Sequence, residues 1–244
     1  MRLAVAIGGV AIFAVILVAT AGARPPQGTQ SVAAAPERKP LATADPASFT
    51  RVDPEMERGR VALDDRADRR IVTVRGLLPP IDGVALPDDP DLLPNAPRDY
   101  RGGWHEGIDF PAPAGTPVRA VANGTIVRVD HDFVDWDADK EQAALDAAVA
   151  LGYTPASTLD LIRGRQVWID HGHGVVTRYA HLSAVADLAV GDAVRAGDVV
   201  GAVGSSGYPE GGPHLHLEVR VGTSYLGDGL VGDALLAAIT AAFG

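Results

Sequence analysis

The chain has 244 residues, of which 47% are hydrophobic, and its 31 acidic and 21 basic side chains give a net charge of −10. This length accommodates one ordinary domain plus a tail, or two small domains, and such a domain can bury a core without cross-links. The acidic balance argues against a nucleic-acid-binding protein, because no basic surplus is present to neutralise phosphates. The absence of cysteine excludes disulfides and thiolate metal sites, so any bound metal must be held by histidines and carboxylates.

The N-terminal segment 1–23 has the features of an export signal. Residues 3–23 carry no charge, and the segment ends in Ala21-Gly22-Ala23, which is typical of a signal-peptide cleavage site. The apolar run is longer than the roughly 7–15 residues of a secretory signal, and it is long enough to span a bilayer of about 30 Å. We therefore expect either a signal peptide or an N-terminal membrane anchor. In both cases the chain is exported to the cell envelope, in the periplasm or outside the cell.

The segment that follows has the composition of a linker. Residues 24–69 begin with a stretch rich in proline, alanine, threonine and serine, which cannot bury enough apolar surface to fold and predicts a disordered linker. Within it, Asp53-Pro54 is a candidate start for a short weak helix. Residues 70–75 alternate like one strand, but residues 79–99 are rich in proline and aspartate without periodicity. We expect 70–99 to form an irregular strap on the surface.

The remaining residues, 100–244, predict a mainly β domain. Short apolar runs alternate with turns rich in glycine, as in the Asn123-Gly124 dipeptide, and this pattern is typical of serial antiparallel hairpins. We expect three hairpins and a last strand, over 118–129, 166–182, 190–203 and 214–221. The fold class is therefore an antiparallel β-sheet domain.

The insertion 131–164 interrupts this β pattern with helical sequence. Asp139 is the expected N-cap of a helix that ends at Gly152, and Thr154-Pro155 begins a second short helix. A further helix is expected over 233–243, at the end of the chain. The domain is thus predicted to contain a short helical insertion and a C-terminal helix.

A first chemical signal is His214-Leu215-His216, in an alternating segment. With a strand period of two, both imidazoles point to one face, whereas Leu215 and Leu217 point to the other. Two neighbouring imidazoles can ligate one metal ion, or one can ligate it while the other contacts its bound water. A solvated polar edge strand is the alternative that this short pattern leaves open.

A second signal is His105-Glu106-Gly107-Ile108-Asp109. On a straight strand, His105 and Asp109 would share a face but lie about 13 Å apart, at roughly 3.3 Å per residue. Gly107 between them permits a backbone bend that would let both side chains reach one ion. A strand with an ordinary surface ion pair is the alternative.

Taken together, these two segments can supply two imidazoles and one carboxylate. This set suits a tetrahedral zinc ion with one position left for water. Such a site lowers the pKa of water to about 7 and polarises a carbonyl, and both effects suit amide hydrolysis.

All seven histidines lie between residues 105 and 216, so others are available for proton transfer. His214, beside the ligand position, and His181 are candidates to take a proton or to bind the developing oxyanion. Strand alternation predicts that Thr177, Tyr179 and His181 share one face. His173 lies in a glycine-rich turn and is expected to be solvated.

These motifs resemble those of the lysostaphin-type (LytM-like) zinc metalloendopeptidases, which cut peptide cross-links of bacterial cell-wall peptidoglycan. The resemblance covers roughly residues 100–227. Its main motifs are His105-x-x-x-Asp109, Tyr179-Ala180-His181-Leu182 and Gly212-Pro213-His214-Leu215-His216-Leu217-Glu218. The resemblance implies one zinc ion per chain and a five-residue site, with His105, Asp109 and His216 as metal ligands and His181 and His214 as the catalytic pair. It also implies a mainly antiparallel β domain with a narrow groove over the metal.

The function implied by this resemblance is zinc-dependent endopeptidase activity, in which metal-activated water attacks an amide. The implied partners are the stem or cross-bridge peptides of peptidoglycan, with N-terminal membrane insertion if the anchor is retained. The main alternative is a non-catalytic scaffold of the same fold that binds the wall or activates an amidase. Degenerate members of that kind lose ligands, whereas all five positions are filled here. Hydrolysis of a non-wall peptide at the same site is a third alternative.

Two regions depart from the resemblance. The loop 205–212 is longer than the usual Ser-Thr-Gly run, and the insertion 131–164 has no counterpart in the minimal domain. The insertion is rich in acidic residues, so it either borders the cleft and attracts cationic stem peptides or forms a solvated helical flap. Its acidic run from Asp135 is not a calcium loop, because Lys140 replaces the required glycine and Asp146 the bidentate glutamate.

Overall fold

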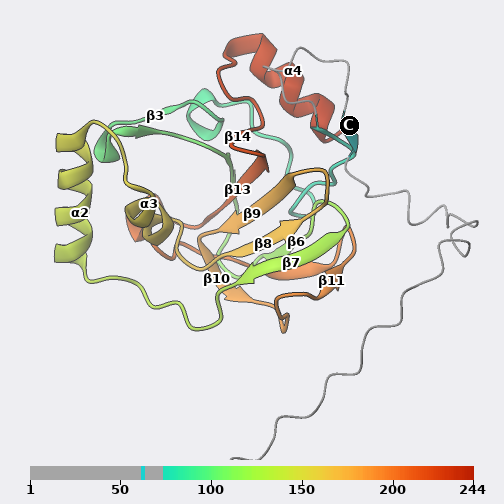
Figure 1. Cartoon of the computed structure of the whole chain (residues 1–244), viewed down its shortest axis with the longest axis horizontal. Coiled ribbons are helices and arrows are strands. Elements are labelled where there is room, and N and C mark those ends of the chain that lie inside the picture. The colour runs from blue at the N-terminus through green and yellow to red at the C-terminus, as the bar shows by residue number, and fades with distance from the viewer. Residues whose placement is uncertain (1–61, 64–73) are drawn as a thin grey trace, which may run out of the picture. The chain divides into compact units, whose positions relative to one another are not determined.

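The computed structural model of this chain describes residues 62–63 and 74–244 (Figure 1). The expected signal peptide or anchor at 1–23 lies outside the described residues. The expected linker at 24–69, with its short helix, also lies outside the described residues, apart from residues 62–63. The same holds for residues 70–73 of the strand expected at 70–75. Among the described residues, no helix is long and apolar enough to cross a membrane.

The described part of the chain is mainly β-structure, with short strands and a few helices. The strands are β1 (Ala62–Leu63), β2 (Val74–Arg75), β3 (Pro97–Arg98), β4 (Gly103–Trp104), β5 (Ile108–Pro111), β6 (Pro117–Arg119), β7 (Gly124–Val129), β8 (Val167–Asp170), β9 (Val175–Ala180), β10 (Leu182–Val185), β11 (Ala193–Val194), β12 (Val199–Val203), β13 (His214–Val221) and β14 (Ser224–Tyr225). The helices are α2 (Ala138–Leu151), α3 (Ala156–Ile162), α4 (Gly232–Ala242) and the 3-10 helices η2 (Pro90–Leu92), η3 (Asp99–Arg101) and η4 (Pro209–Gly211).

Two antiparallel sheets contain most of the strands. The larger sheet has the order β11-β7-β8-β9-β13-β14, with β5 also paired to β13, and the smaller sheet has the order β10-β12-β6. All strand pairings within the described residues are antiparallel. The predicted fold class, a mainly antiparallel β domain, is confirmed, and the last strand has the predicted bounds.

Of the three predicted hairpins, only the one over 166–182 is present, as the antiparallel pair β8–β9. The prediction for 118–129 is wrong, because β6 pairs with β12 whereas β7 pairs with β8 and β11. The prediction for 190–203 is wrong for the same reason, since β11 and β12 belong to different sheets. A turn signal locates a chain reversal, but it does not specify which distant strand becomes the partner.

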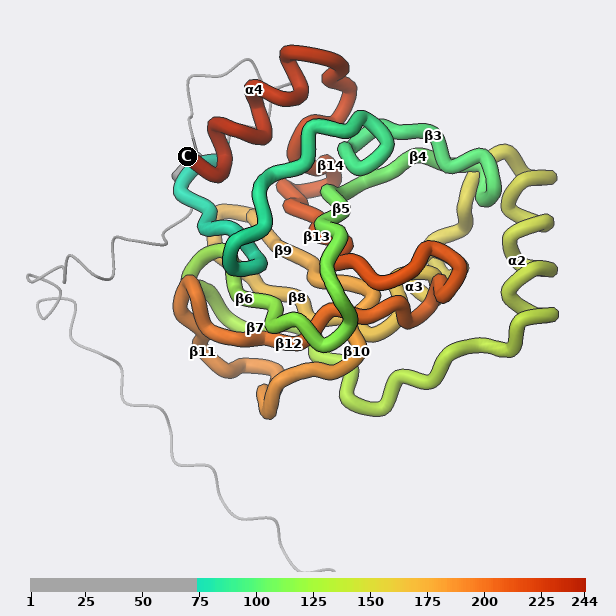
Figure 2. The backbone as a smooth tube through the Cα atoms, turned by 180° about the vertical axis from the view of Figure 1, so that it is seen from behind, coloured from blue at the N-terminus to red at the C-terminus, as the bar shows by residue number. Residues whose placement is uncertain are grey.

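Of the two helices of the insertion, α2 lies at the edge opposite β11 in both views of the backbone, and α3 lies between α2 and the strands (Figures 1 and 2). Gly152 ends α2 as predicted, with a left-handed φ of 73°. The N-cap is Asp137 rather than Asp139, because the Asp137 carboxylate accepts a hydrogen bond from the Asp139 N–H at 3.1 Å. Helix α4 matches the expected C-terminal helix to within one residue.

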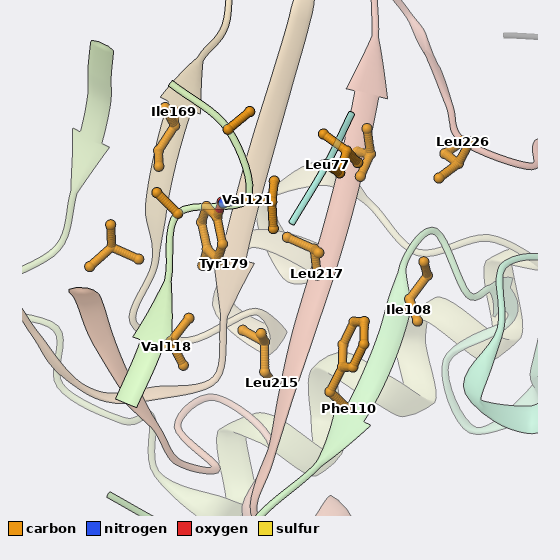
Figure 3. Close-up of a cluster of buried hydrophobic side chains, with 14 of the residues drawn as sticks. Leu77, Ile108, Phe110, Val118, Val121, Ile169, Tyr179, Leu215, Leu217 and Leu226 are labelled. Carbon is orange, nitrogen blue, oxygen red and sulfur yellow. The ribbon is translucent and has the colours of Figure 1, made fainter. Parts of the chain in front are cut away.

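The hydrophobic core takes side chains from both sheets, and Figure 3 shows its centre. Leu215 and Leu217 of β13 are fully buried there, beside Tyr179 of β9. The Tyr179 hydroxyl accepts a hydrogen bond from the Val121 N–H at 2.8 Å, which satisfies its polar atom inside the core. The core face of β13 thus fixes the position of the strand. The opposite face of the same strand carries the candidate site.

The strap predicted at 70–99 is irregular where the structure describes it, but it is not confined to the surface. Leu77, Ile81 and Leu93 are almost completely buried and belong to the core cluster. The Leu77 N–H also donates to the carbonyl of Ala242 at 2.9 Å, next to helix α4. The expectation of a surface strap is therefore wrong for these residues, because aperiodic sequence can still bury single apolar side chains.

Candidate metal centre and active site

Strand β13 and its two neighbours position the site. As the alternation predicts, His214 and His216 lie on the face opposite the core. The antiparallel register sets His216 opposite Asp109 of β5 on one side and opposite Ala180 of β9 on the other. His181 directly follows Ala180, so three separate segments of the chain meet at His216.

Three potential metal donors converge in this place. His105 Nε2 lies 3.0 Å from Asp109 Oδ1 and 3.0 Å from His216 Nδ1, and Asp109 Oδ1 lies 2.8 Å from His216 Nδ1. In a tetrahedral zinc site with metal–ligand distances of about 2.0–2.1 Å, neighbouring donors are about 3.3 Å apart, close to this triangle. The three residues are buried and form the only group of three or more candidate ligands within residues 62–63 and 74–244.

Gly107 permits the bend that brings His105 and Asp109 together, as the sequence predicts. Residue 107 is a bend just before β5, after which the chain pairs with β13. A Cβ at this position would lie 2.7 Å from the carbonyl oxygen of Leu217 and 2.8 Å from Cε1 of His216. Only glycine therefore lets the backbone approach the imidazole this closely.

Each histidine donor has its second ring nitrogen against an acceptor. His105 Nδ1 lies 2.8 Å from the carbonyl oxygen of Leu93, and His216 Nε2 lies 3.3 Å from Glu218 Oε1. An N–H at these positions leaves the lone pair on the nitrogen that faces the donor triangle. Burial lowers the pKa of His105 below its ordinary value of 6.5. Burial also opposes a charge on His216, but hydrogen bonds to Asp109 and Glu218 raise its pKa.

Asp109 is held as a carboxylate at the centre of the cluster. Burial opposes its charge, but the charges and hydrogen bonds of His105 and His216 hold its pKa well below the ordinary 3.8. Its outer oxygen, Oδ2, accepts a hydrogen bond from Arg98 Nη2 at 3.3 Å. This contact leaves Oδ1 to face the two histidine nitrogens.

The two predicted catalytic histidines lie beside the donor triangle. The ring centroids of His181 and His214 are 4.7 Å apart, and His214 Nε2 is 3.8 Å from Asp109 Oδ1. The Nδ1 atoms of both rings face carbonyl oxygens at 2.9 Å, that of Ser206 for His181 and that of Gly212 for His214. With a proton on Nδ1, each ring keeps an unprotonated Nε2 to accept a proton.

The face expected for His181 is wrong. Thr177 and Tyr179 do share the core face, where their hydroxyls hydrogen-bond at 3.2 Å. Strand β9 ends at Ala180, however, and His181 has a left-handed φ of 59°, so its side chain lines the cleft instead. Burial, with the nearby His214 and His216, lowers the pKa of His181 to about 3, which keeps the ring neutral in the metal-free protein.

A cleft of about 260 Å³ lies over these residues. One wall comes from the segment around η3, another from loop 205–212, and the rings of Tyr100 and Tyr208 stack between them, 4.9 Å apart at 12°. The insertion also borders the cleft, and the residues it contributes to the lining are Leu159, Ile162 and Arg163. The insertion is therefore more than a solvated flap, but the residues that it adds to the cleft are apolar or basic rather than acidic.

The other histidines lie outside the site. His171 hydrogen-bonds the carbonyl of Asn123 and the hydroxyl of Thr177, at 2.8 and 2.7 Å. His131 contacts a backbone carbonyl, and His173 is exposed, as predicted. The five histidine and aspartate positions predicted for the site are thus brought together, and the remaining histidines are not.

Sequence reasoning missed the residues that hold the ligands in place. Glu218, Arg98 and Arg163 contact the site or its ligands, but none of them was assigned a role. For Glu218 a signal was present, because strand alternation places it on the face of His214 and His216. Arg98 and Arg163 come from the irregular strap and the insertion, where no periodicity indicates their direction.

The model of peptidase family M23 matches residues 103–227, more than half of the chain, so the chain belongs to this family. The resemblance to lysostaphin-type peptidases is confirmed by this match. The donor set also fits zinc, the metal of this class, because it combines two nitrogen donors and one oxygen donor at suitable spacing.

Among its relatives, the chain is similar to the DD-carboxypeptidase/endopeptidase Mpg of Neisseria meningitidis serogroup B, with 42% identity over 117 residues, 48% of this chain and 20% of that protein. It is also similar to the peptidoglycan DD-endopeptidase ShyC of Vibrio cholerae, with 27% identity over 117 residues, again 48% and 20%. The chain thus matches about a fifth of the length of these relatives. The solved catalytic domain of the antimicrobial peptidase lysostaphin from Staphylococcus simulans shares 29% identity, with a TM-score of 0.35, over 49% of this chain and 69% of that one.

Proposed function

We propose that this chain is a zinc-dependent endopeptidase that hydrolyses peptide cross-links of bacterial cell-wall peptidoglycan. The observation that carries the proposal is the convergence of His105 Nε2, Asp109 Oδ1 and His216 Nδ1 within a cleft that also contains His181 and His214. The three donors would hold one zinc ion per chain, and the two histidines beside them would form the catalytic pair.

A zinc ion held by these donors supplies a Lewis acid that polarises the scissile carbonyl and acidifies water. His181 and His214 keep an unprotonated Nε2 beside the donor triangle, so either can accept the proton released when water attacks the amide. The protonated ring can then return that proton to the leaving amine or donate a hydrogen bond to the developing oxyanion. His181 is buried and His214 is partly buried, which limits the access of bulk water and strengthens these interactions.

The substrate class is proposed from the relatives and from the shape of the site. Relatives that match this domain are named as a DD-carboxypeptidase/endopeptidase and as a peptidoglycan DD-endopeptidase. A small cleft between two walls suits an extended peptide rather than a folded protein. We therefore propose stem or cross-bridge peptides as partners. The proposed chain organisation is an export signal or anchor at 1–23, a linker over 24–69, the strap over 70–99 and the peptidase domain over 100–244, acting in the cell envelope.

The experiment that tests the proposal is digestion of purified peptidoglycan by the full chain, with mass analysis of the released fragments and metal analysis of the protein. Wild type should contain about one zinc per chain and release new peptide ends, and His216→Ala should lose both properties because a ligand is missing. His173→Ala is the matched control, since His173 is exposed outside the cleft. Activity that survives in His216→Ala would reject the assignment of the site.

The same experiment separates the enzyme from the non-catalytic scaffold. A wild-type protein that binds zinc and wall but releases no peptide ends would be a scaffold. No feature of the described residues favours this alternative, because the complete set of donors and both neighbouring histidines are present.

A further inference from the structure

We propose that the insertion serves the metal centre through Arg163, which acts with Glu218 as a pair of positioning residues for the ligand His216. This inference rests on the proposed function, because it concerns the geometry of the metal ligand. It assigns a role to the insertion, which departs from the minimal domain, and to a buried ion pair outside the donor set.

The contact between Arg163 and Glu218 is short and buried. Arg163 follows helix α3, and its Nε donates to Glu218 Oε1 at 2.6 Å. Only 8% of the Arg163 side chain and 1% of the Glu218 side chain are exposed to solvent. Arg163 Nη2 also donates to Glu106 Oε2 at 3.1 Å, and Glu106 directly follows the ligand His105 in the sequence. The guanidinium thus links helix α3 to two carboxylates at the base of the cleft.

Glu218 transmits this contact to the metal ligand. The oxygen that accepts from Arg163, Oε1, also lies 3.3 Å from His216 Nε2, so one atom joins the arginine and the imidazole. The second oxygen accepts from Arg178 at 3.3 Å, which fixes the plane of the carboxylate. With Nε2 turned to Glu218, His216 presents Nδ1 to Asp109 and His105. A carboxylate in this position sets both the orientation and the tautomer of a ligating histidine.

The backbone of Arg163 supports the other half of the site. Its carbonyl oxygen accepts a hydrogen bond from the His181 N–H at 2.8 Å, at a residue whose left-handed φ of 59° requires support from its surroundings. The next residue, Gly164, lies so close to Ser206 that a Cβ would collide with its backbone. Ser206 in turn accepts from His181 Nδ1. The end of the insertion therefore contacts both catalytic and metal-ligating segments.

A purely structural role makes a different prediction from a positioning role. A buried ion pair is weak evidence for stability, because desolvation opposes its attraction. If Arg163 only stabilised the fold, its loss would lower the melting temperature but leave the zinc affinity of the folded protein unchanged. If it positions His216, zinc affinity falls in protein that is still folded.

The test is a competition titration of the full chain against a zinc chelator. Replacement of either partner, in Arg163→Met or Glu218→Gln, should raise the dissociation constant for zinc by about 10–100-fold, the usual effect of losing a partner of a ligating histidine. Arg128→Met is the matched control. It removes an arginine that pairs with Asp160 of the same helix α3 at 2.6 Å but does not contact Glu218. The control should change the dissociation constant less than twofold. An unchanged affinity in both folded variants would overturn the proposal.

A second readout does not depend on bound metal. In the metal-free chain, both ring nitrogens of His216 face a carboxylate oxygen, so Glu218→Gln should lower the fraction of His216 rings that carry a proton on Nε2, measured by ¹⁵N imidazole chemical shifts. An unchanged fraction of Nε2 protonation would count against the positioning role. If Arg163→Met does not fold, Arg163→Lys keeps a charge in place but cannot form the same branched contacts, and its zinc affinity should still fall. A wild-type chain that binds no zinc would reject the proposed function, whereas variants that bind as tightly as wild type would reject only this inference.

Discussion

The two faces of strand β13 differ in the kind of contact on which their side chains depend. On the core face, Leu215 and Leu217 are held by general apolar packing with many neighbours. On the cleft face, His216 and Glu218 depend on particular atoms of Asp109, His105 and Arg163, which come from distant parts of the chain. Because side chains alternate along a strand, residues that stabilise the core and residues proposed for the chemistry occupy opposite faces of β13.

The two faces should therefore respond to mutation in different ways. A core residue tolerates another apolar residue of similar volume, because packing is non-directional. A residue of the cleft face tolerates few substitutions, because its polar atoms have specific hydrogen-bonding partners.

Replacement of His181 by alanine should lower kcat by about 10²–10⁴-fold, the usual contribution of a general acid or base. Zinc content should remain near that of wild type, because His181 is not one of the three donors. The measurement is the rate of peptide release from purified wall, together with metal analysis. Loss of zinc in this variant would show that the catalytic and ligand roles are not separate.

On the core face, Leu217→Ala should lower the free energy of unfolding by about 2–5 kcal/mol, because it leaves a cavity in the centre of the core. Leu217→Met, which keeps the volume, should cost less than about 1.5 kcal/mol. Urea unfolding of both variants measures the effect. If folded Leu217→Ala lost zinc affinity while its stability stayed near that of wild type, the separation of the two faces would be wrong.

The stability of the metal-free chain should depend on pH through His181. Its folded pKa of about 3 lies below the ordinary 6.5, so between these values the unfolded chain binds a proton that the folded chain does not. The free energy of unfolding should thus fall by up to about 1.4 kcal/mol per pH unit as pH decreases through this window. His216, whose pKa is raised, acts in the opposite sense and above this window.

Urea unfolding between about pH 6 and pH 4.5 measures this slope. These pH values lie above the ordinary pKa range of carboxylates, so carboxylate titration contributes little to it. His181→Ala should show a shallower slope than wild type, since the buried imidazole is gone. Equal slopes in the two proteins would contradict the assignment of a low pKa to His181.

The smallest expected effect is at the exposed turn. His173 is exposed and has a left-handed φ of 53°, a conformation that costs a non-glycine residue roughly 1–2 kcal/mol. His173→Gly should therefore raise the free energy of unfolding by about 1 kcal/mol. Peptide release should not change. A loss of activity would show that the chemistry extends beyond the cleft face and its partners.

The sequence predicts much of the domain because its local patterns are strong. The alternation over 214–221 gives the bounds of β13 and the directions of His214 and His216, and Gly107 gives the bend between two ligands. Pairing between distant strands is not encoded in a turn dipeptide, so the Asn123-Gly124 signal led to the wrong partner for β6. Local sequence specifies elements better than it specifies their neighbours.

The sequence predicts donors for the site, but it does not predict the residues that support them. Histidine and aspartate are chemically distinctive, so residue type and spacing indicated candidate donors, and the family resemblance implied His105, Asp109 and His216 among them. The contacts of Leu93 and Ser206 use backbone carbonyls, which every residue possesses. These hydrogen bonds depend on tertiary structure, and the type of residue does not indicate them.

The carbonyl of Leu93 and the guanidinium of Arg98 both lie upstream of residue 103, where the family match begins. A shortened protein trimmed to that match would keep every donor atom but lose the acceptor of His105 Nδ1 and the neighbour of Asp109 Oδ2. His105 would then be free to rotate or to exchange tautomers. The smallest unit that retains a well-ordered centre must therefore begin before Leu93, so choosing fragment ends by homology alone would discard part of the site.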